Sequence, residues 1–171
     1  MHHWCKLRFD LLPSIPHSKT RPPYRTMTST IAPTTAQAES SIPEGFEPID
    51  RGSAFLALLG PVYMKQASPD RTVIGVRIDG RHTNVKGIAH GGMLTTLADS
   101  ALGIAIAIAN NEKPMVTVNL STDFVAAAHP GDWVEAHVDI QRIGARLAFA
   151  NCYLHVGEKR IMRASGVFAS V

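Results

Sequence analysis

Residues 91–109 (GGMLTTLADSALGIAIAIA) constrain the fold more than any other part of the sequence, because they form one long apolar segment with a single charge. The apolar residues that recur at helical spacing are Met93, Leu94, Leu97, Ala101, Ile104 and Ile108. The segment is too long for a strand, and its period is that of an amphipathic helix. Its length would also suit a membrane span, but Asp99 lies in its middle and small residues lower its hydrophobicity. The segment therefore predicts a long helix buried inside a folded domain.

Runs of β-favouring residues lie on both sides of this helix. Residues 52–59 predict a short helix or buried lead-in, and residues 61–66 and 71–79 predict a hairpin around a turn at 68–70. After Pro114, four further runs occupy residues 115–125, 132–143, 146–155 and 160–171, with short turns between them. Consecutive strands joined by short turns form an antiparallel meander. The pattern predicts an α+β domain in which a curved antiparallel sheet wraps around the long central helix.

The charge distribution argues against a nucleic-acid partner, although the formal charge is +3 and the pI is near 9.1. Residues 1–26 carry five Lys or Arg and one Asp, a balance of +4, which leaves −1 for residues 27–171. Aromatic residues make up only 6% of the chain. Because nucleic-acid binding depends on basic surfaces, often with interleaved aromatics, we expect no such partner.

Residues 1–44 are predicted to be a disordered leader, since they are rich in Pro, Ser and Thr and lack a sustained apolar period. Their Arg and Ser content resembles a transit peptide, but they have neither a convincing amphipathic helix nor the apolar core of a secretory signal. We favour a third interpretation, in which translation starts at Met27. The folded domain is placed at residues 45–171. Cys5 and Cys152 show no paired or metal-ligand spacing, which is typical of a reducing compartment and favours the cytoplasm.

Asp99 is the only charged residue of the predicted helix. At about 100° per residue it lies nearly opposite the apolar stripe. It shares its face with small residues and Ile106 rather than with the Lys and Glu of a solvated surface. The alternative is that Asp99 merely marks the solvated side. A carboxylate in such surroundings needs partners, and one in a cleft is a candidate base or nucleophile.

The helix is preceded by residues 84–92 (NVKGIAHGG). Gly91 and Gly92 leave backbone N–H groups unblocked at the positive end of the helix dipole, which suits a developing oxyanion. A thioester carbonyl could dock there. Taken alone, however, the pattern is better explained as a glycine-rich helix start with His90 as a packing or capping residue.

Taken together, these residues resemble the signature of the hotdog-fold thioesterases. The order is Asn84, then His90-Gly91-Gly92, then Asp99 on the helix and a hydroxyl residue at position 117. The closest similarity is to the branch named for phenylacetic acid degradation (PaaI-like), and it covers residues 52–171. The resemblance implies an acyl-CoA thioesterase that needs no metal or other cofactor. It also implies a homodimer or homotetramer whose active site lies between subunits.

Carried over by position, the resemblance implies a role for each residue of the signature. Asp99 would act as general base on water or as nucleophile, and the Gly91 N–H would polarise the thioester carbonyl. Asn84 and His90 match residues that orient the carbonyl or hold the loop. Thr117, where relatives often have Ser, would position water or the carboxylate. Its β-branched side chain keeps the hydroxyl but has less rotamer freedom.

Gly92 is predicted to lie beside the substrate, and Arg142 and Arg146 flank a turn where they could meet the phosphates of coenzyme A. Paired arginines beside a hairpin are usually just solvated, so this assignment competes with a plain surface interpretation. Cys152 and His155 are too close in a β-like run to form a convincing catalytic pair.

Two other functions stay open at this point. A hotdog hydratase or dehydratase would usually carry its Asp and His before the helix, whereas here the acid lies within it. A non-catalytic acyl-CoA-binding or regulatory protein would not need Asp99. The sequence names neither the acyl group nor the number of subunits.

Overall fold

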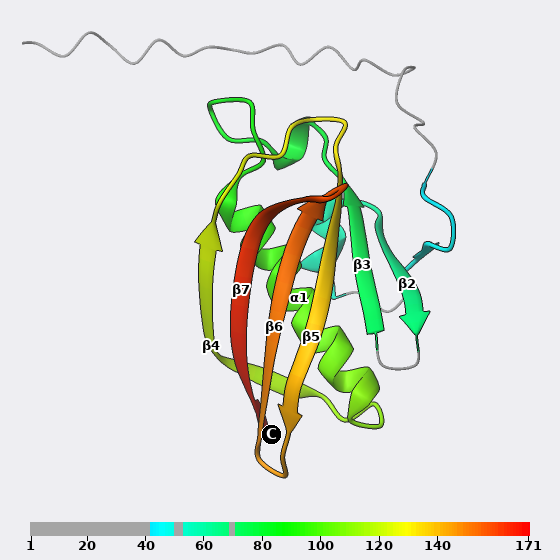
Figure 1. Cartoon of the computed structure of the whole chain (residues 1–171), viewed down its shortest axis with the longest axis vertical. Helices are drawn as coiled ribbons and strands as arrows, with labels where there is room; N and C mark the ends of the chain where they lie inside the picture. Colours follow the sequence, from blue (N-terminus) through cyan, green and yellow to red (C-terminus); the bar gives the residue numbers. More distant parts are fainter. Residues whose placement is uncertain (1–41, 50–52, 69–70) are drawn as a thin grey trace, which may run out of the picture. The chain divides into compact units, whose positions relative to one another are not determined.

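The computed structural model describes residues 42–49, 53–68 and 71–171, all within one compact unit. Residues 1–41, which include most of the predicted leader and the alternative start at Met27, lie outside the described residues. In the described part, a seven-stranded antiparallel sheet wraps one long helix (Figure 1). The predicted α+β arrangement is confirmed.

The long helix predicted from the sequence is α1, Gly91–Ala109. Its buried residues are Met93, Leu94, Leu97, Ala98, Ala101, Leu102, Ala105 and Ile106. The predicted apolar stripe is partly wrong, because Ile104 and Ile108 are only half-buried whereas Ile106 is fully buried. The reason is that the curved sheet contacts the helix through five strands, so that more than one flank is covered. By length and composition α1 could also cross a membrane, but here it packs against the sheet.

The sheet contains all the strands that the sequence predicts, with small shifts at their ends, and also a two-residue strand at residues 47–48 that the sequence does not predict. They are β1 (Glu47–Pro48), β2 (Val62–Ser68), β3 (Arg71–Arg77), β4 (Met115–Phe124), β5 (Trp133–Ile143), β6 (Leu147–Val156) and β7 (Lys159–Ser170). Strands β2 and β3 form the predicted hairpin, whose turn at 69–70 lies outside the described residues. The spatial order is β1-β2-β3-β5-β6-β7-β4.

The predicted meander is wrong for β4, which pairs with β7 at the far edge of the sheet and not with β5. The connection at residues 125–132 is longer than the tight turn expected at 129–131. Its backbone contacts β7 through Ala126 N–H and Ile161 O, then the loop before α1, and finally the end of β3 through Ile78 N–H and Asp132 O. The chain thus crosses from one part of the sheet to another, and no described strand pairs with the outer edge of β4.

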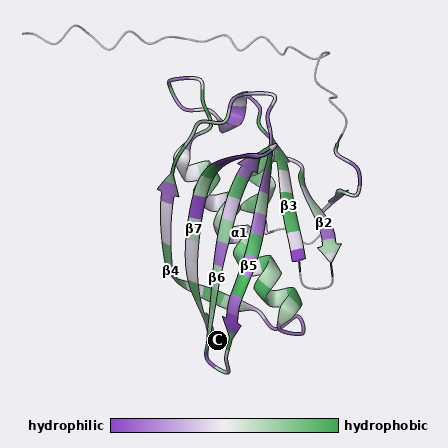
Figure 2. Cartoon of the chain, viewed as in Figure 1, coloured by the Kyte–Doolittle hydropathy of each residue, from purple (hydrophilic) through white to green (hydrophobic). Residues whose placement is uncertain are grey.

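Side chains alternate between the two faces of the sheet, and Figure 2 shows hydrophobic and hydrophilic residues interspersed along the strands. On β5, Val134, Ala136 and Val138 are buried on the face that packs against α1. The residues that alternate with them lie on the outer face and are more exposed. The sheet lies close to the helix at Gly166. A Cβ there would lie 2.7 Å from the Phe168 ring and 3.0 Å from Leu102, so only glycine fits.

Two short 3-10 helices precede α1. The first, η1 (Leu56–Leu59), occupies the predicted lead-in, but only Leu56 is buried. Phe55 and Leu58 are 64% and 70% exposed, so the interpretation as a buried lead-in is largely wrong. The second, η2 (Gly80–His82), follows β3 and begins the loop that leads to α1.

Candidate active site

The structure brings Asp99 together with Thr117. The Thr117 Oγ1 donates a hydrogen bond to Asp99 Oδ1 at 2.8 Å. Thr117 lies next to a β-bulge in β4, before Asn119, and bulges of this kind re-aim side chains. Asp99 is half-buried and forms no ion pair with any described basic residue. One carboxylate oxygen is therefore fixed by a hydroxyl, and the other is left for a water molecule or a substrate.

The start of α1 is held by His90. Its Nδ1 accepts a hydrogen bond from the Gly92 N–H at 2.9 Å, so this nitrogen carries no proton. The capping role considered for His90 is thus present. Because the cap uses the Gly92 N–H, the N–H of Gly91 is the one that has no acceptor in the described part of the chain. Of the two glycines, Gly91 is the free donor at the positive end of the helix.

Residues 82–90 form what we call the helix-start loop. Asn84 Oδ1 accepts from the Lys86 N–H at 2.8 Å, and the Asn84 N–H donates to Ile88 O at 2.9 Å. Gly87, with φ +73°, allows the turn between them. These contacts fit the loop-holding role for Asn84; its role toward the carbonyl stays a prediction.

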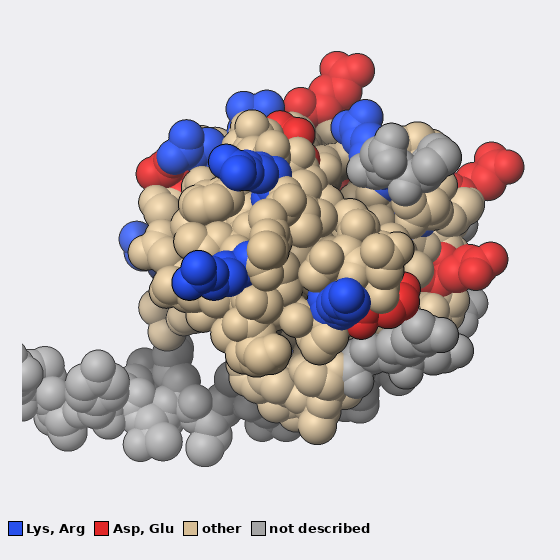
Figure 3. Space-filling view, turned by 90° about the horizontal axis from the view of Figure 1, so that it is seen from below, with Lys and Arg blue, Asp and Glu red and all other residues tan. Residues whose placement is uncertain are grey.

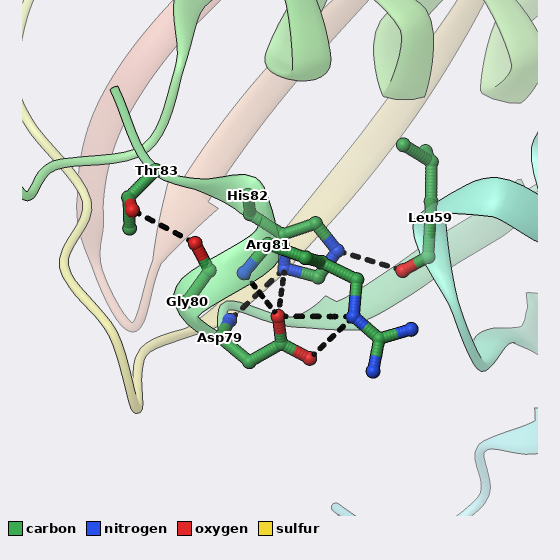
Figure 4. A network of polar contacts seen from close by, with 6 residues as sticks. All are labelled: Leu59, Asp79, Gly80, Arg81, His82 and Thr83. Carbon is green, nitrogen blue, oxygen red and sulfur yellow. Dashed lines mark hydrogen bonds and ion pairs between the residues drawn. The ribbon is translucent and has the colours of Figure 1, made fainter. Parts of the chain in front are cut away.

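His82 was not singled out from the sequence, yet it lies at the base of this loop (Figure 4). It is 3% exposed, and both ring nitrogens contact backbone groups of Asp79 and Leu59. Asp79 caps η2 by accepting a hydrogen bond from the Arg81 N–H at 2.9 Å. An Asp three residues before a His at the end of a strand resembles a capping box, and that signal could have drawn attention to it.

A cavity of about 370 Å³ opens beside Gly91, between the helix-start loop and the end of β4. Its lining is apolar except for Asn84. The Phe124 ring forms one wall and lies 3.2 Å from the position of a Cβ on Gly91. Phe124 is 51% exposed, so this wall is itself open to solvent in the single chain.

Asp99 and Gly91 do not meet within one chain. They lie eight residues apart on α1, which corresponds to about 12 Å along the helix axis. Attack on a carbonyl requires the base and the oxyanion donor to act within hydrogen-bonding distance of the same group. The two halves of the candidate site are each well formed, but a single chain does not combine them.

Arg142 and Arg146 lie at the β5–β6 hairpin, and both are exposed and without an ion pair among the described residues. The hairpin lies beside the first residues of β4, because Ser170, which pairs with Met115, donates to Arg146 O at 3.0 Å. Seen from this end of the molecule, Lys and Arg side chains are separated by uncharged surface (Figure 3). These arginines are thus near the Thr117 end of β4 and far from the helix-start loop.

The remaining titratable groups of β6 do not form a nucleophilic pair. Burial raises the pKa of the Cys152 thiol to about 12, so the thiol stays protonated. Cys152 is fully buried toward α1, whereas the His155 ring lies against that of His137, with centroids 5.2 Å apart. Burial, and then the neighbouring His137, lower the pKa of His155. Among the described residues no group of three or more His, Cys, Asp or Glu could hold a metal ion.

Comparison with known proteins gives one consistent result. Residues 86–162 match the family model described as "Thioesterase superfamily". The chain is 47% identical to the Pseudomonas aeruginosa protein named "Putative esterase PA0474" over 75% of this chain and 96% of that protein. It is 29% identical to mouse "Acyl-coenzyme A thioesterase 13" over 57% of this chain and 69% of that one. The fold matches a solved mutant of the phenylacetic acid degradation protein PaaI from Thermus thermophilus, with a TM-score of 0.63, 24% identity, and coverage of 70% and 100%.

Proposed function

The chain belongs to the thioesterase superfamily and has its hotdog fold, and from this premise we propose that it is an acyl-CoA thioesterase that works as a homo-oligomer. The observation that carries the proposal is the half-buried Asp99 carboxylate, fixed by Thr117, in a helix whose first N–H is free. The mouse relative named for acyl-coenzyme A supports the choice of thioester.

In the proposed reaction, Asp99 acts as general base on water. The water oxygen attacks the thioester carbonyl carbon while its proton passes to the carboxylate, and the negative charge that forms on the carbonyl oxygen is stabilised by the Gly91 N–H. When the C–S bond breaks, the sulfur leaves with the proton returned from Asp99. The products are a carboxylic acid and free CoA. Direct attack by Asp99 through an anhydride is the alternative route to the same products.

The other residues of the site hold the proposed reacting groups in place. Thr117 holds the carboxylate, and His90 and Asn84 hold the loop that presents Gly91. Gly92 lies beside the bound thioester. The apolar cavity beside Gly91 is the proposed place for the acyl group.

A second copy of the chain would complete the site. The outer edge of β4 is unpaired and carries exposed apolar residues, with Val116 at 48% and Val118 at 61% exposure. An edge of this kind is a template for pairing with another strand. Antiparallel pairing of two β4 edges about a two-fold axis would bring Asp99 of one chain toward the Gly91 of the other. The proposed unit is a homodimer, alone or within a homotetramer.

Coenzyme A is the proposed partner molecule, with Arg142 and Arg146 contacting its phosphates. We propose that the protein is cytoplasmic, that it binds neither nucleic acid nor membranes, and that it needs no metal or other cofactor. The acyl specificity is left to experiment.

The test is free-thiol release from a panel of aryl and straight-chain acyl-CoAs by the wild type and by Asp99→Asn. The amide is nearly the same size as the carboxylate but is not a base, so we expect a loss of about 10²–10⁴-fold in kcat. Asp139→Asn changes an exposed carboxylate on β5, outside the candidate site, and is the matched control that should keep its rate. Acyl-CoA binding without thiol release by the wild type would instead identify a binding protein, and hydroxyacyl-CoA as product would identify a hydratase.

A further inference from the structure

The His82 side chain joins two segments of the backbone, the end of η1 and the turn that follows β3 (Figure 4). Its Nε2 lies 2.7 Å from the carbonyl oxygen of Leu59, the last residue of η1. Its Nδ1 accepts a hydrogen bond from the Asp79 N–H at 2.9 Å. Because a carbonyl can only accept and a backbone N–H can only donate, the ring must be neutral with its proton on Nε2. The buried side chain is fully satisfied in this one tautomer.

The backbone of His82 is hydrogen-bonded to the residue that directly precedes α1. The His82 carbonyl accepts a hydrogen bond from the His90 N–H at 2.8 Å, and a bridge between Thr83 and Ala89 continues the pairing. His90 in turn caps the helix and directly precedes Gly91. No unpaired stretch separates the His82 ring from the free N–H, so a shift of the ring would be carried to Gly91.

His82 does not touch the cavity beside Gly91. Asp79 and Arg81 are the charged residues next to it: Asp79 Oδ1 lies 3.5 Å from the ring Nδ1, and the Arg81 guanidinium pairs with the same carboxylate at 3.1 Å. Any effect of His82 on hydrolysis must therefore act through the helix-start loop.

We propose that His82 is a positioning residue for hydrolysis: its neutral ring fixes the base of the helix-start loop and thereby aims the Gly91 N–H at the thioester oxygen. This inference rests on the proposed thioesterase function. It differs from a simple packing role in its consequence. A packing residue sets the stability of the fold, whereas a positioning residue sets kcat even in variants that are fully folded.

The experiment compares three variants in the thiol-release assay. His82→Leu removes both ring contacts; a displacement of the donor by ~1 Å costs about 10²-fold in rate, so kcat should fall by roughly 10- to 100-fold. KM should change less than kcat, because the arginines proposed to contact CoA lie elsewhere, although the loop lines the cavity proposed for the acyl group. His82→Gln places an amide N–H where Nε2 lies and should recover most of the loss. His82→Asn can keep only the contact with Asp79 and should fall between the two.

A control of matched stability separates positioning from packing. In Gly75→Ala the new Cβ would meet Trp133 on the outer face, far from the helix-start loop, so this variant should be destabilised but keep its kcat. All rates are compared well below each unfolding midpoint.

Equal kcat in Gly75→Ala and His82→Leu at similar Tm would overturn the inference and leave the thioesterase proposal intact. If His82→Leu does not fold, wild-type kcat in both His82→Gln and His82→Asn would overturn it equally. A wild type that releases no thiol from any acyl-CoA would overturn the proposed function, and this inference with it.

Discussion

A site shared between chains predicts that two inactive variants restore each other. The first variant is Asp99→Asn, which removes the base. The second is Gly91→Pro, which removes the N–H proposed to bind the oxyanion and adds the proline ring. Proline is well tolerated at the first position of a helix, and His90, with φ −69° and ψ 130°, has the extended conformation that precedes proline. The Phe124 ring, 3.2 Å from the new Cβ, is half-exposed and free to move aside.

Each variant alone should be nearly inactive. Loss of one oxyanion donor typically costs about 10²–10³-fold in kcat, and loss of a general base about 10²–10⁴-fold. Equal mixing gives roughly one half heterodimers, each with one intact and one doubly defective site. The mixture should therefore recover roughly one quarter of the wild-type rate. If each variant alone keeps about 1% of that rate, the recovery is ~25-fold.

The assay is thiol release after the two chains are unfolded together and refolded, or after co-expression with two affinity tags. A chain that carries both substitutions, mixed with wild type, is a control in which the activity should fall instead of recover. In that heterodimer both shared sites are defective, so an equal mixture keeps only the quarter contributed by wild-type homodimers. If each chain held a complete site, the same mixture would keep about one half. Mixed single variants that stay at the baseline would refute a site built from two chains.

Three other predictions concern single positions. Thr117→Val keeps the shape but loses the hydroxyl that holds the proposed catalytic carboxylate, so kcat should fall about 5- to 20-fold and Thr117→Ser should retain activity; unchanged kcat in the valine variant would contradict the contact. Gly75→Ala should cost about 1–3 kcal/mol in denaturant unfolding, because its Cβ would overlap the Trp133 ring, whereas Gly80→Ala, in open space, should change stability by less than about 0.5 kcal/mol. Cys152, with its pKa raised to about 12 by burial, should resist alkylation at pH 8 until the protein unfolds, and rapid labelling of the folded protein would show that this part of the core opens.

Local patterns were enough to predict α1 and strands β2 to β7, but not the short elements β1 and η2. The helix could be placed because a long apolar period with a single charge has few alternatives, and α1 begins and ends where that period does. The strand positions followed from β-branched runs between turn residues. The pairing of β4 could not be predicted in the same way. It depends on which edge the chain reaches after residue 125, and that is decided by contacts far apart in the sequence, such as those of Ala126 and Ala128.

The candidate site likewise contains residues that local patterns predict and one that they do not. Asp99, Gly91 and Thr117 could be named because each has a local signature or a family match. The structure shows the hydrogen bond from Thr117 to Asp99, and the roles of the three residues stay predictions. His82 was not named from the sequence. The spacing of Asp79 and His82 is that of a capping box, but the contact that joins the ring to Leu59, 23 residues earlier in the chain, leaves no pattern of side chains that a sequence would reveal.

The exposure of both halves of the site gives a further reason to expect that the proposed site needs a second chain. In the single chain, Thr117 and Phe124 are open to water, and so is the donor end of α1. Hydrogen bonds and dipoles stabilise a developing oxyanion far better when water is excluded than when it competes for the same groups. Pairing along β4 would therefore do two things at once: it would bring the carboxylate to the oxyanion donor, and it would remove the water that weakens both. A chain diluted below its dimer dissociation constant should lose activity in proportion to the dimer fraction, because no residual site of lower efficiency is left in the monomer.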